Sequence, residues 1–155
     1  MAGFETTVRL EDEAATAALG ARIARGLKQG DAVLLEGELG AGKTTLARAI
    51  LRSLGVESHV PSPTFTLVQP YETAQLALYH FDLYRIESAS EIAELGMDEA
   101  LDEGAALVEW PENGFPRHLA EDALTITLST LGTNEREAFI SGPTRWRNII
   151  AETSA

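Results

Sequence analysis

A stretch of eight residues places three glycines ahead of a lysine and a threonine: Gly37-Glu38-Leu39-Gly40-Ala41-Gly42-Lys43-Thr44. A short apolar run at residues 32–36 precedes it, and residues 43 to about 54 follow with leucine and isoleucine at helical spacing. Together they fit the pattern G-x-x-x-x-G-K-[ST] in the strand–loop–helix setting that this pattern requires. Such a unit has to bury its strand in a sheet and pack its helix against it, so the sequence predicts an α/β protein.

This stretch has the chemistry of a phosphate-binding loop. Glycines let the backbone curl until successive N–H groups point inward at an anion, and the start of the following helix adds its positive end. Lys43 would contact the β- and γ-phosphates, and the Thr44 hydroxyl would be an oxygen ligand for Mg²⁺. The alternative is a glycine-rich turn that fits by chance, which the strand–loop–helix setting disfavours. The expected nucleotide-binding residues are Gly37, Glu38, Leu39, Gly40, Ala41, Gly42, Lys43, Thr44 and Thr45.

Apolar runs and turn signals indicate further strands and helices. Expected strands lie at residues 6–10, 32–36, 64–69, 76–81, 105–108, 124–128 and 137–140, the last two joined by a turn at 132–134. Expected helices follow Asp12 and Ser90 as N-caps, begin at Lys43, and include a short one near Trp146. Strands that alternate with helices predict a layered sheet, and the length of 155 residues fits one domain, 1–155.

Composition excludes several classes of function. The chain has no cysteine, which excludes disulfides, thiolate metal sites and thiol catalysis. It carries 12 Lys and Arg against 24 Asp and Glu, a net charge of −12, which argues against nucleic-acid binding by this chain alone. The N-terminus lacks the pattern of a signal peptide, and no apolar run approaches the ~20 residues that cross a bilayer. We therefore expect a cytoplasmic protein without membrane contact.

Two acids are candidates for the second half of a magnesium site. Asp82 follows the apolar run 78–81, and Glu109 follows the apolar run 106–108. Ligands of open α/β sheets gather at such strand ends, and a phosphate-binding loop needs an acid to hold Mg²⁺ directly or through water. Either acid could instead be a solvated side chain at a strand end. The pattern does not decide which of the two would orient the attacking water.

Four blocks of sequence together resemble one family. The first is the glycine-rich loop extended to Leu46. The other three are Ser62-Pro63-Thr64-Phe65-Thr66-Leu67-Val68, Tyr79-His80-Phe81-Asp82-Leu83-Tyr84-Arg85 and Glu109-Trp110-Pro111-Glu112. In this order and spacing the chain resembles the TsaE family, the bacterial P-loop ATPases of tRNA threonylcarbamoyladenosine synthesis. The resemblance extends from about residue 7 to about residue 128.

The resemblance implies a three-layer P-loop NTPase fold with a mostly parallel sheet flanked by helices. It also implies ATP and Mg²⁺ as ligands, and a complex with the proteins TsaB and TsaD. In that complex TsaD modifies adenosine 37 of tRNA, and the TsaE-like subunit hydrolyses ATP to sustain turnover, touching tRNA only indirectly. By motif position, Lys43, Asp82 and Glu109 are the catalytic candidates, and Thr44 and Glu109 are the Mg²⁺ ligands. Residues 62–68 correspond to a switch-like loop.

Several residues allow two interpretations. Thr64 or Thr66 could sense the γ-phosphate or simply favour a strand, and Arg85 could contact phosphate or anchor the acidic helix. His80 could titrate near neutral pH, although burial with a hydrogen bond is the more common state of such a histidine. Trp110 is favoured as a packing residue over a base-stacking one. The acids between residues 91 and 103 form either a docking face for a basic partner or a solvated helix face.

Other functions remain as alternatives. A small P-loop kinase generally needs an arginine-bearing lid, and the arginines of this chain are scattered. A GTPase needs a guanine-reading motif around a lysine, and neither Lys28 nor Lys43 lies in one. A nucleotide-dependent interaction module is the non-enzymatic alternative. The turn at 131–134 and the start of the first helix are a weak guess for the position of the adenine base, and the stretch after Leu131 has no recognised role.

Overall fold

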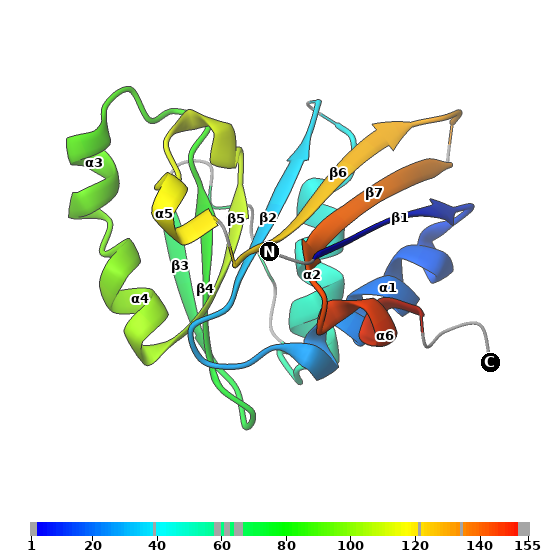
Figure 1. Cartoon of the computed structure of the whole chain (residues 1–155), viewed down its shortest axis with the longest axis horizontal. Helices are drawn as coiled ribbons and strands as arrows, with labels where there is room; N and C mark the ends of the chain where they lie inside the picture. Colours follow the sequence, from blue (N-terminus) through cyan, green and yellow to red (C-terminus); the bar gives the residue numbers. More distant parts are fainter. Residues whose placement is uncertain are drawn as a thin grey trace.

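The computed structural model describes residues 3–38, 40–57, 60, 63, 67–120, 122–133 and 135–151. These residues form a mixed α/β fold in which helices flank a seven-stranded sheet (Figure 1). The strands are β1 (Gly3–Leu10), β2 (Ala32–Gly37), β3 (Val68–Glu72), β4 (Ala77–Asp82), β5 (Gly104–Glu109), β6 (Leu124–Thr130) and β7 (Arg136–Pro143). The helices are α1 (Glu13–Gly26), α2 (Lys43–Ser53), α3 (Ala89–Glu94), α4 (Met97–Glu103), α5 (Arg117–Ala120) and α6 (Trp146–Ala151), with a 3₁₀ turn η1 (Pro111–Asn113).

The expectation of a mostly parallel sheet was wrong. The order is β1-β7-β6-β2-β5-β4-β3, and only the pairs β6–β2, β2–β5 and β5–β4 are parallel. The pairs β1–β7, β7–β6 and β4–β3 are antiparallel. The physical reason lies in the connections, because β3–β4 and β6–β7 are joined by short turns, and short turns can join only antiparallel strands. The parallel part is therefore the inner four strands.

The two faces of the sheet are covered by different helices. One apolar cluster joins α1, α2 and α6 to one face through Ile23, Leu46, Ile50 and Trp146, among others. A second cluster joins α3 and α4 to the opposite face of β2, β4 and β5, and its members include Ile92. The inner strands are consequently buried on both sides, which explains why β2 and β5 are almost continuously apolar in sequence.

Most expected elements are confirmed within one to three residues. Asp12 is the N-cap of α1, and its carboxylate accepts a hydrogen bond of 2.9 Å from the N–H of Ala15. The helix expected after Ser90 begins earlier, because Ser88 is the N-cap and Glu91 completes a capping box. Of the strand expected at 64–69, residues 64–66 lie outside the described residues. The described strand β3 begins at Val68, directly after Leu67, whose φ of 70° is not that of an extended strand.

The phosphate-loop candidate lies where the sequence predicts it, between β2 and α2. The loop lies at the same edge of the sheet as the carboxyl ends of β5 and β4, because β2 pairs in parallel with β5, and β5 with β4 (Figure 1). Among the helices of the described residues, none combines the length and apolar character needed to span a lipid bilayer.

Candidate functional site

The backbone between β2 and α2 needs glycine at two positions. Gly42 is the N-cap of α2 with a φ of 105°, a left-handed conformation that side chains disfavour. Gly37 ends β2 with a φ of 144°, and a Cβ there would lie 2.6 Å from the backbone oxygen of Leu128 on β6. The loop can therefore turn tightly into the helix, whose first N–H groups have no partner within the helix. This is the geometry that an anion at the helix start requires.

Lys43 is the first residue of α2, and its side chain folds back against the loop and is buried. Its Nζ donates to the backbone oxygens of Gly37 at 2.6 Å and Glu38 at 3.0 Å. The same Nζ lies 4.0 Å from the centre of the Trp110 ring. Burial lowers the pKa of Lys43, and the nearby carboxylates, with Glu109 the strongest, oppose that shift. The loop carbonyls and the indole ring thus hold a cation above the start of α2.

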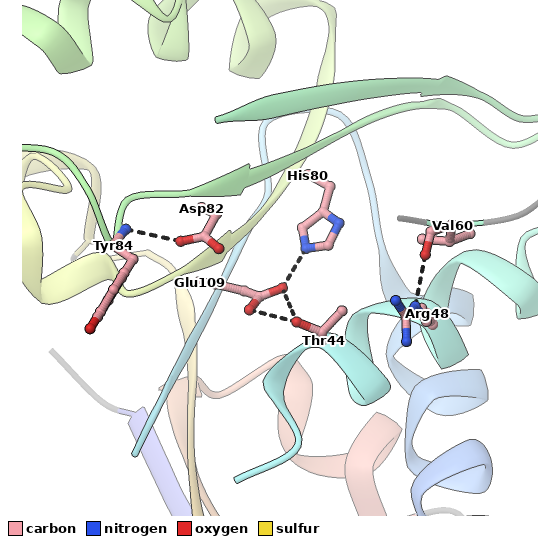
Figure 2. A network of polar contacts seen from close by, with 7 residues as sticks. All are labelled: Thr44, Arg48, Val60, His80, Asp82, Tyr84 and Glu109. Carbon is pink, nitrogen blue, oxygen red and sulfur yellow. Dashed lines mark hydrogen bonds and ion pairs between the residues drawn. The ribbon is translucent and has the colours of Figure 1, made fainter. Parts of the chain in front are cut away.

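Thr44, Glu109 and His80 form one network beneath the loop (Figure 2). The Thr44 hydroxyl lies 2.9 Å and 3.0 Å from the two oxygens of the Glu109 carboxylate. His80 Nε2 lies 2.7 Å from Glu109 Oε2, and both side chains are buried. The expectation that His80 is buried and hydrogen-bonded is confirmed. Three segments that are distant in sequence therefore converge on one carboxylate.

Asp82 and Glu109 end neighbouring parallel strands in register. Because strand side chains alternate, His80 and Asp82 share a face of β4, and Leu107 and Glu109 share the same face of β5. That face packs against α2, which carries Thr44. Asp82 is buried, and its Oδ1 accepts a hydrogen bond of 2.9 Å from the N–H of Tyr84. The structure thus brings both acids predicted from sequence to one end of the sheet.

Two adjoining hollows lie at this end of the sheet. One of about 310 Å³ is lined by Gly40, Gly42, Lys43, Thr44, Thr45, Asp82, Tyr84, Glu109, Trp110 and Arg136. The other, of about 340 Å³, is lined by Leu10, Asp12, Glu13, Thr16, Ala41, Gly42, Thr45, Leu128 and Arg136. They share Gly42, Thr45 and Arg136, so the loop and the first turn of α2 lie between them. Each is lined by two carboxylates, Asp82 and Glu109 in the first and Asp12 and Glu13 in the second. The start of α1 lines the second hollow, whereas residues 131–133 do not, and the guess for the adenine base stays a prediction.

Arg136 is a site residue that sequence reasoning missed. It begins β7 and lines both hollows, and its Nε donates to the backbone oxygen of Ala41 at 3.1 Å. The antiparallel return of β7 beside β6 brings this guanidinium to the loop. No local motif surrounds Arg136, so only the topology could have identified it.

Other candidates lie elsewhere or outside the described residues. Leu39, Thr64 and Thr66 are outside the described residues, as is most of the switch-like segment 62–68. Arg85 is exposed and does not line the hollow beside the loop. Trp110 packs against the second apolar cluster and has an unusual φ of 58°. Its ring contacts that of Tyr84, with the ring centroids 4.8 Å apart and the planes tilted by 49°. The acids of α3 and α4 are mostly exposed.

The oxygen atoms at the loop suit a magnesium ion. Thr44 and Glu109 supply a hydroxyl and a carboxylate within 3.0 Å of each other, and Mg²⁺ in nucleotide sites takes one or two such protein ligands beside phosphate and water. Across the described part of the chain, no cluster of three or more His, Cys, Asp or Glu side chains could hold a metal by itself. The hydroxyl of Thr44 and the carboxylate of Glu109 are therefore oxygen ligands of the kind that Mg²⁺ takes.

Comparisons with known proteins identify the family. A family model described as "Threonylcarbamoyl adenosine biosynthesis protein TsaE" matches residues 10–138. Proteins named "tRNA threonylcarbamoyladenosine biosynthesis protein TsaE" from Rickettsia felis and Bacillus subtilis are 43% and 40% identical to this chain. These matches cover 82% and 96% of the chain, and 74% and 91% of the relatives. The crystal structure of Bacillus subtilis YdiB matches with a TM-score of 0.78 at 30% identity, over 98% of this chain and 95% of that one. The resemblance seen in the four sequence blocks is thereby confirmed, and the chain belongs to the TsaE family.

Proposed function

We propose that this protein is the ATP-binding and ATP-hydrolysing subunit of the complex that makes threonylcarbamoyladenosine at position 37 of tRNA. The observation that carries the proposal is the meeting of Lys43 and Thr44 with Glu109 and Asp82 at one end of the sheet. The family supplies the pathway, because its members are named for threonylcarbamoyladenosine biosynthesis.

The proposed fold type is that of a P-loop NTPase. Support comes from the inner strands β6-β2-β5-β4, which are parallel, and from the glycine loop that leads from β2 into α2. Ligands of such sheets bind beyond the carboxyl ends of the strands, which is where the loop and both acids lie. The antiparallel outer strands leave this arrangement unchanged.

Each side chain has a role in the proposed reaction. Lys43, now hydrogen-bonded to two loop carbonyls, would turn to the β- and γ-phosphate oxygens, which are better acceptors because they are charged. Thr44 and Glu109 would hold Mg²⁺, which when bound neutralises phosphate charge. Asp82 lies beside Glu109 and would orient or deprotonate the attacking water. In this assignment α2 supplies the groups that bind phosphate and Mg²⁺, and the ends of β4 and β5 supply the carboxylates that act on water and Mg²⁺.

The hollow beside the start of α1 is the proposed place for the adenosine part of ATP. It adjoins the loop through Gly42 and Thr45, so one ligand can occupy both hollows. Its wall combines apolar side chains such as Leu128 with the carboxylates of Asp12 and Glu13, which can accept hydrogen bonds from an amino group. Arg136 stands between the two parts and would approach the phosphates.

Partner proteins complete the proposal. A net charge of −12 disfavours direct capture of tRNA, so tRNA would be bound by other subunits, proposed as TsaD and TsaB. Among the residues that line the loop hollow, Arg136 is the one arginine, and it is bonded to the loop itself. Activation by an inserted arginine typically adds ~10³–10⁵ in rate, so we expect slow hydrolysis by the isolated chain and faster hydrolysis in the complex.

The test is steady-state ATP hydrolysis by the chain alone and then with TsaB and TsaD from the same source. Fast hydrolysis alone, unchanged by the partners, would contradict the subunit role. Nucleotide binding and complex formation without any hydrolysis would instead favour a nucleotide-dependent interaction module. Tight binding of tRNA by the isolated chain at physiological salt would contradict the charge argument.

A further inference from the structure

We propose that His80 is a positioning residue, which fixes the Glu109 carboxylate so that its free lone pairs face Thr44 and the loop. The inference rests on the proposed function, because it assigns a purpose to the orientation of the proposed magnesium ligand. Neither the loop motif nor the two acids require a histidine at this place.

The contact between His80 and Glu109 is short and fully enclosed. The exposed fractions of the two side chains are 0% and 3%, and the separation between Nε2 and Oε2 is 2.7 Å. The proposal assigns the proton of this contact to His80 Nε2, because an ionised carboxylate can only accept a hydrogen bond. A hydrogen bond to a charged acceptor in a dry environment is among the stronger ones, which makes it suited to hold one orientation.

The other ring nitrogen shows that packing alone does not explain the histidine. His80 Nδ1 is buried and has no hydrogen-bond partner within the described part of the chain. Burying an unpaired polar atom costs free energy that an apolar side chain of similar size would avoid. The hydrogen bond from Nε2 to Glu109 gives a reason for a histidine here despite this cost. Among the described residues, the hydrogen bond to Glu109 is the one polar contact of the ring, and the buried position of the ring on β4 keeps its Nε2 at that carboxylate.

Glu109 receives its other contact from the loop side. Thr44 donates one proton, so its hydroxyl can satisfy one carboxylate oxygen at a time, although it lies near both. Thr44 is the second residue of α2, directly after the loop, where a nucleotide would bind. His80 belongs instead to β4, which pairs with β5 along the whole strand. The sheet therefore holds one carboxylate oxygen whatever the loop does, and leaves the other oxygen for the loop and its ligand.

Side chains alternate between the two faces of β4, so every second residue of this strand lies on the face that packs against α2. Leu78, His80 and Asp82 face α2, and the first of these is buried in the apolar cluster of that face. Leu78 has no side-chain polar atoms and lies two residues from His80. It is therefore a matched control for damage to this strand that leaves the carboxylate untouched.

The experiment compares two substitutions that remove the donor with one that restores it. In His80→Asn the amide lies closer to the main chain than Nε2 does in the wild type, so it cannot reach Glu109. In His80→Met the side chain fills the space but has no hydrogen-bond donor. His80→Gln can place an amide N–H near the position of Nε2. Leu78→Ala controls for loss of stability. For each variant, melting temperature, affinity for a fluorescent ATP analogue without metal, and the Mg²⁺ concentration that half-saturates binding and turnover are measured.

We expect His80→Asn and His80→Met to raise the half-saturating Mg²⁺ concentration about 10–100-fold, the usual effect of losing a partner of a metal ligand. Metal-free ATP affinity should stay near wild type, and His80→Gln should recover most of the Mg²⁺ response. Leu78→Ala should lower the melting temperature without this shift. Any of three results would overturn the inference. The Mg²⁺ response of His80→Asn and His80→Met could equal that of the wild type, it could equal that of Leu78→Ala, or His80→Gln could show the same shift as the two variants without a donor.

A metal-free measurement keeps the test decisive if the donor-less variants do not fold. In the wild-type protein, nitrogen NMR should show His80 protonated at Nε2 with a slowly exchanging proton, and Glu109→Ala should lose that protection. A proton on Nδ1 alone, or fast exchange, would overturn the inference. A wild-type protein that binds no ATP would refute the proposed function, and with it the purpose assigned here to His80. A wild-type protein that binds and hydrolyses ATP normally, beside unaffected His80 variants, would refute only the role of His80.

Discussion

The loop side and the strand-end side of the site are built in different ways. The loop side consists of consecutive residues, in which β2 passes through Gly37 and Gly42 directly into α2. The strand-end side consists of Asp82 and Glu109, which lie far apart in sequence and meet because β4 and β5 pair in register. One side depends on local backbone conformation, whereas the other depends on the whole sheet.

This difference has a functional consequence. A one-residue slip of β5 against its neighbours would turn Glu109 to the opposite face, away from Thr44. The loop would keep its own conformation after such a slip. Binding of the phosphates should therefore depend mainly on loop residues, and use of the metal and hydrolysis mainly on strand-end residues. Substitutions on the two sides can separate these effects.

The largest effect is expected for Lys43→Ala on the loop side. This substitution removes the only buried ammonium that contacts the loop among the described residues, so backbone donors and the partly buried Arg136 would be left to face the phosphates. We expect ATP binding to fall below detection in a titration with a fluorescent ATP analogue. Lys28→Ala is the matched control, because Lys28 is exposed and lines neither hollow beside the loop. Wild-type affinity and turnover in Lys43→Ala would refute the phosphate-loop assignment.

The next effect is expected for Asp82→Ala on the strand-end side. Removal of a group that orients or deprotonates water should lower hydrolysis ~10²–10⁴-fold, with ADP affinity nearly unchanged. Asp82→Asn keeps an acceptor for the N–H of Tyr84 and so separates the charge from the turn that it stabilises. Asp98→Asn on the exposed side of α4 serves as control. Parental hydrolysis rates in both Asp82 variants would remove Asp82 from the chemistry.

The same division explains what the sequence could predict. Local features were predictable: the strand–loop–helix unit around Lys43, the N-cap at Asp12 and the apolar strands that end at Asp82 and Glu109. Each depends on neighbouring residues only. The hydrogen bond between His80 and Glu109 was not predictable, because it requires the pairing and register of β4 and β5.

The outer strands show where the sequence prediction failed. Short turns at 73–76 and 131–135 required antiparallel hairpins, yet the expectation of a mostly parallel sheet came from family resemblance and overrode that local signal. Arg136 was missed for another reason. The sequence predicted the two strands joined by the turn at 132–134, but not that the first residue of β7 contacts the backbone of Ala41.

Intermediate effects are expected for Thr44→Ala and Glu109→Ala, which join the two sides. Both remove an oxygen from the proposed magnesium site, so the half-saturating Mg²⁺ concentration should rise by about 10-fold or more. Binding of the ATP analogue without metal should change less. The measurement is a Mg²⁺ titration of binding and turnover for each variant. Wild-type Mg²⁺ titrations in both variants would show that these residues are not the metal ligands.

The smallest effect is expected for Arg136→Gln, on the edge between the two hollows. Arg136 is only partly buried, so water and salt screen its attraction for phosphate, and we expect a loss of about fivefold in ATP affinity. The loss should shrink as salt rises from about 0.05 to about 0.3 M, since screening weakens the wild-type contact itself. Arg147→Gln on α6 is the control, because Arg147 is exposed and lines neither hollow beside the loop. Melting temperatures are measured in parallel, because Arg136 also bonds to the backbone of Ala41 and its loss could loosen the loop. Unchanged affinity at low salt, or a loss equal to that of Arg147→Gln, would show that the guanidinium supports the loop without contacting the nucleotide.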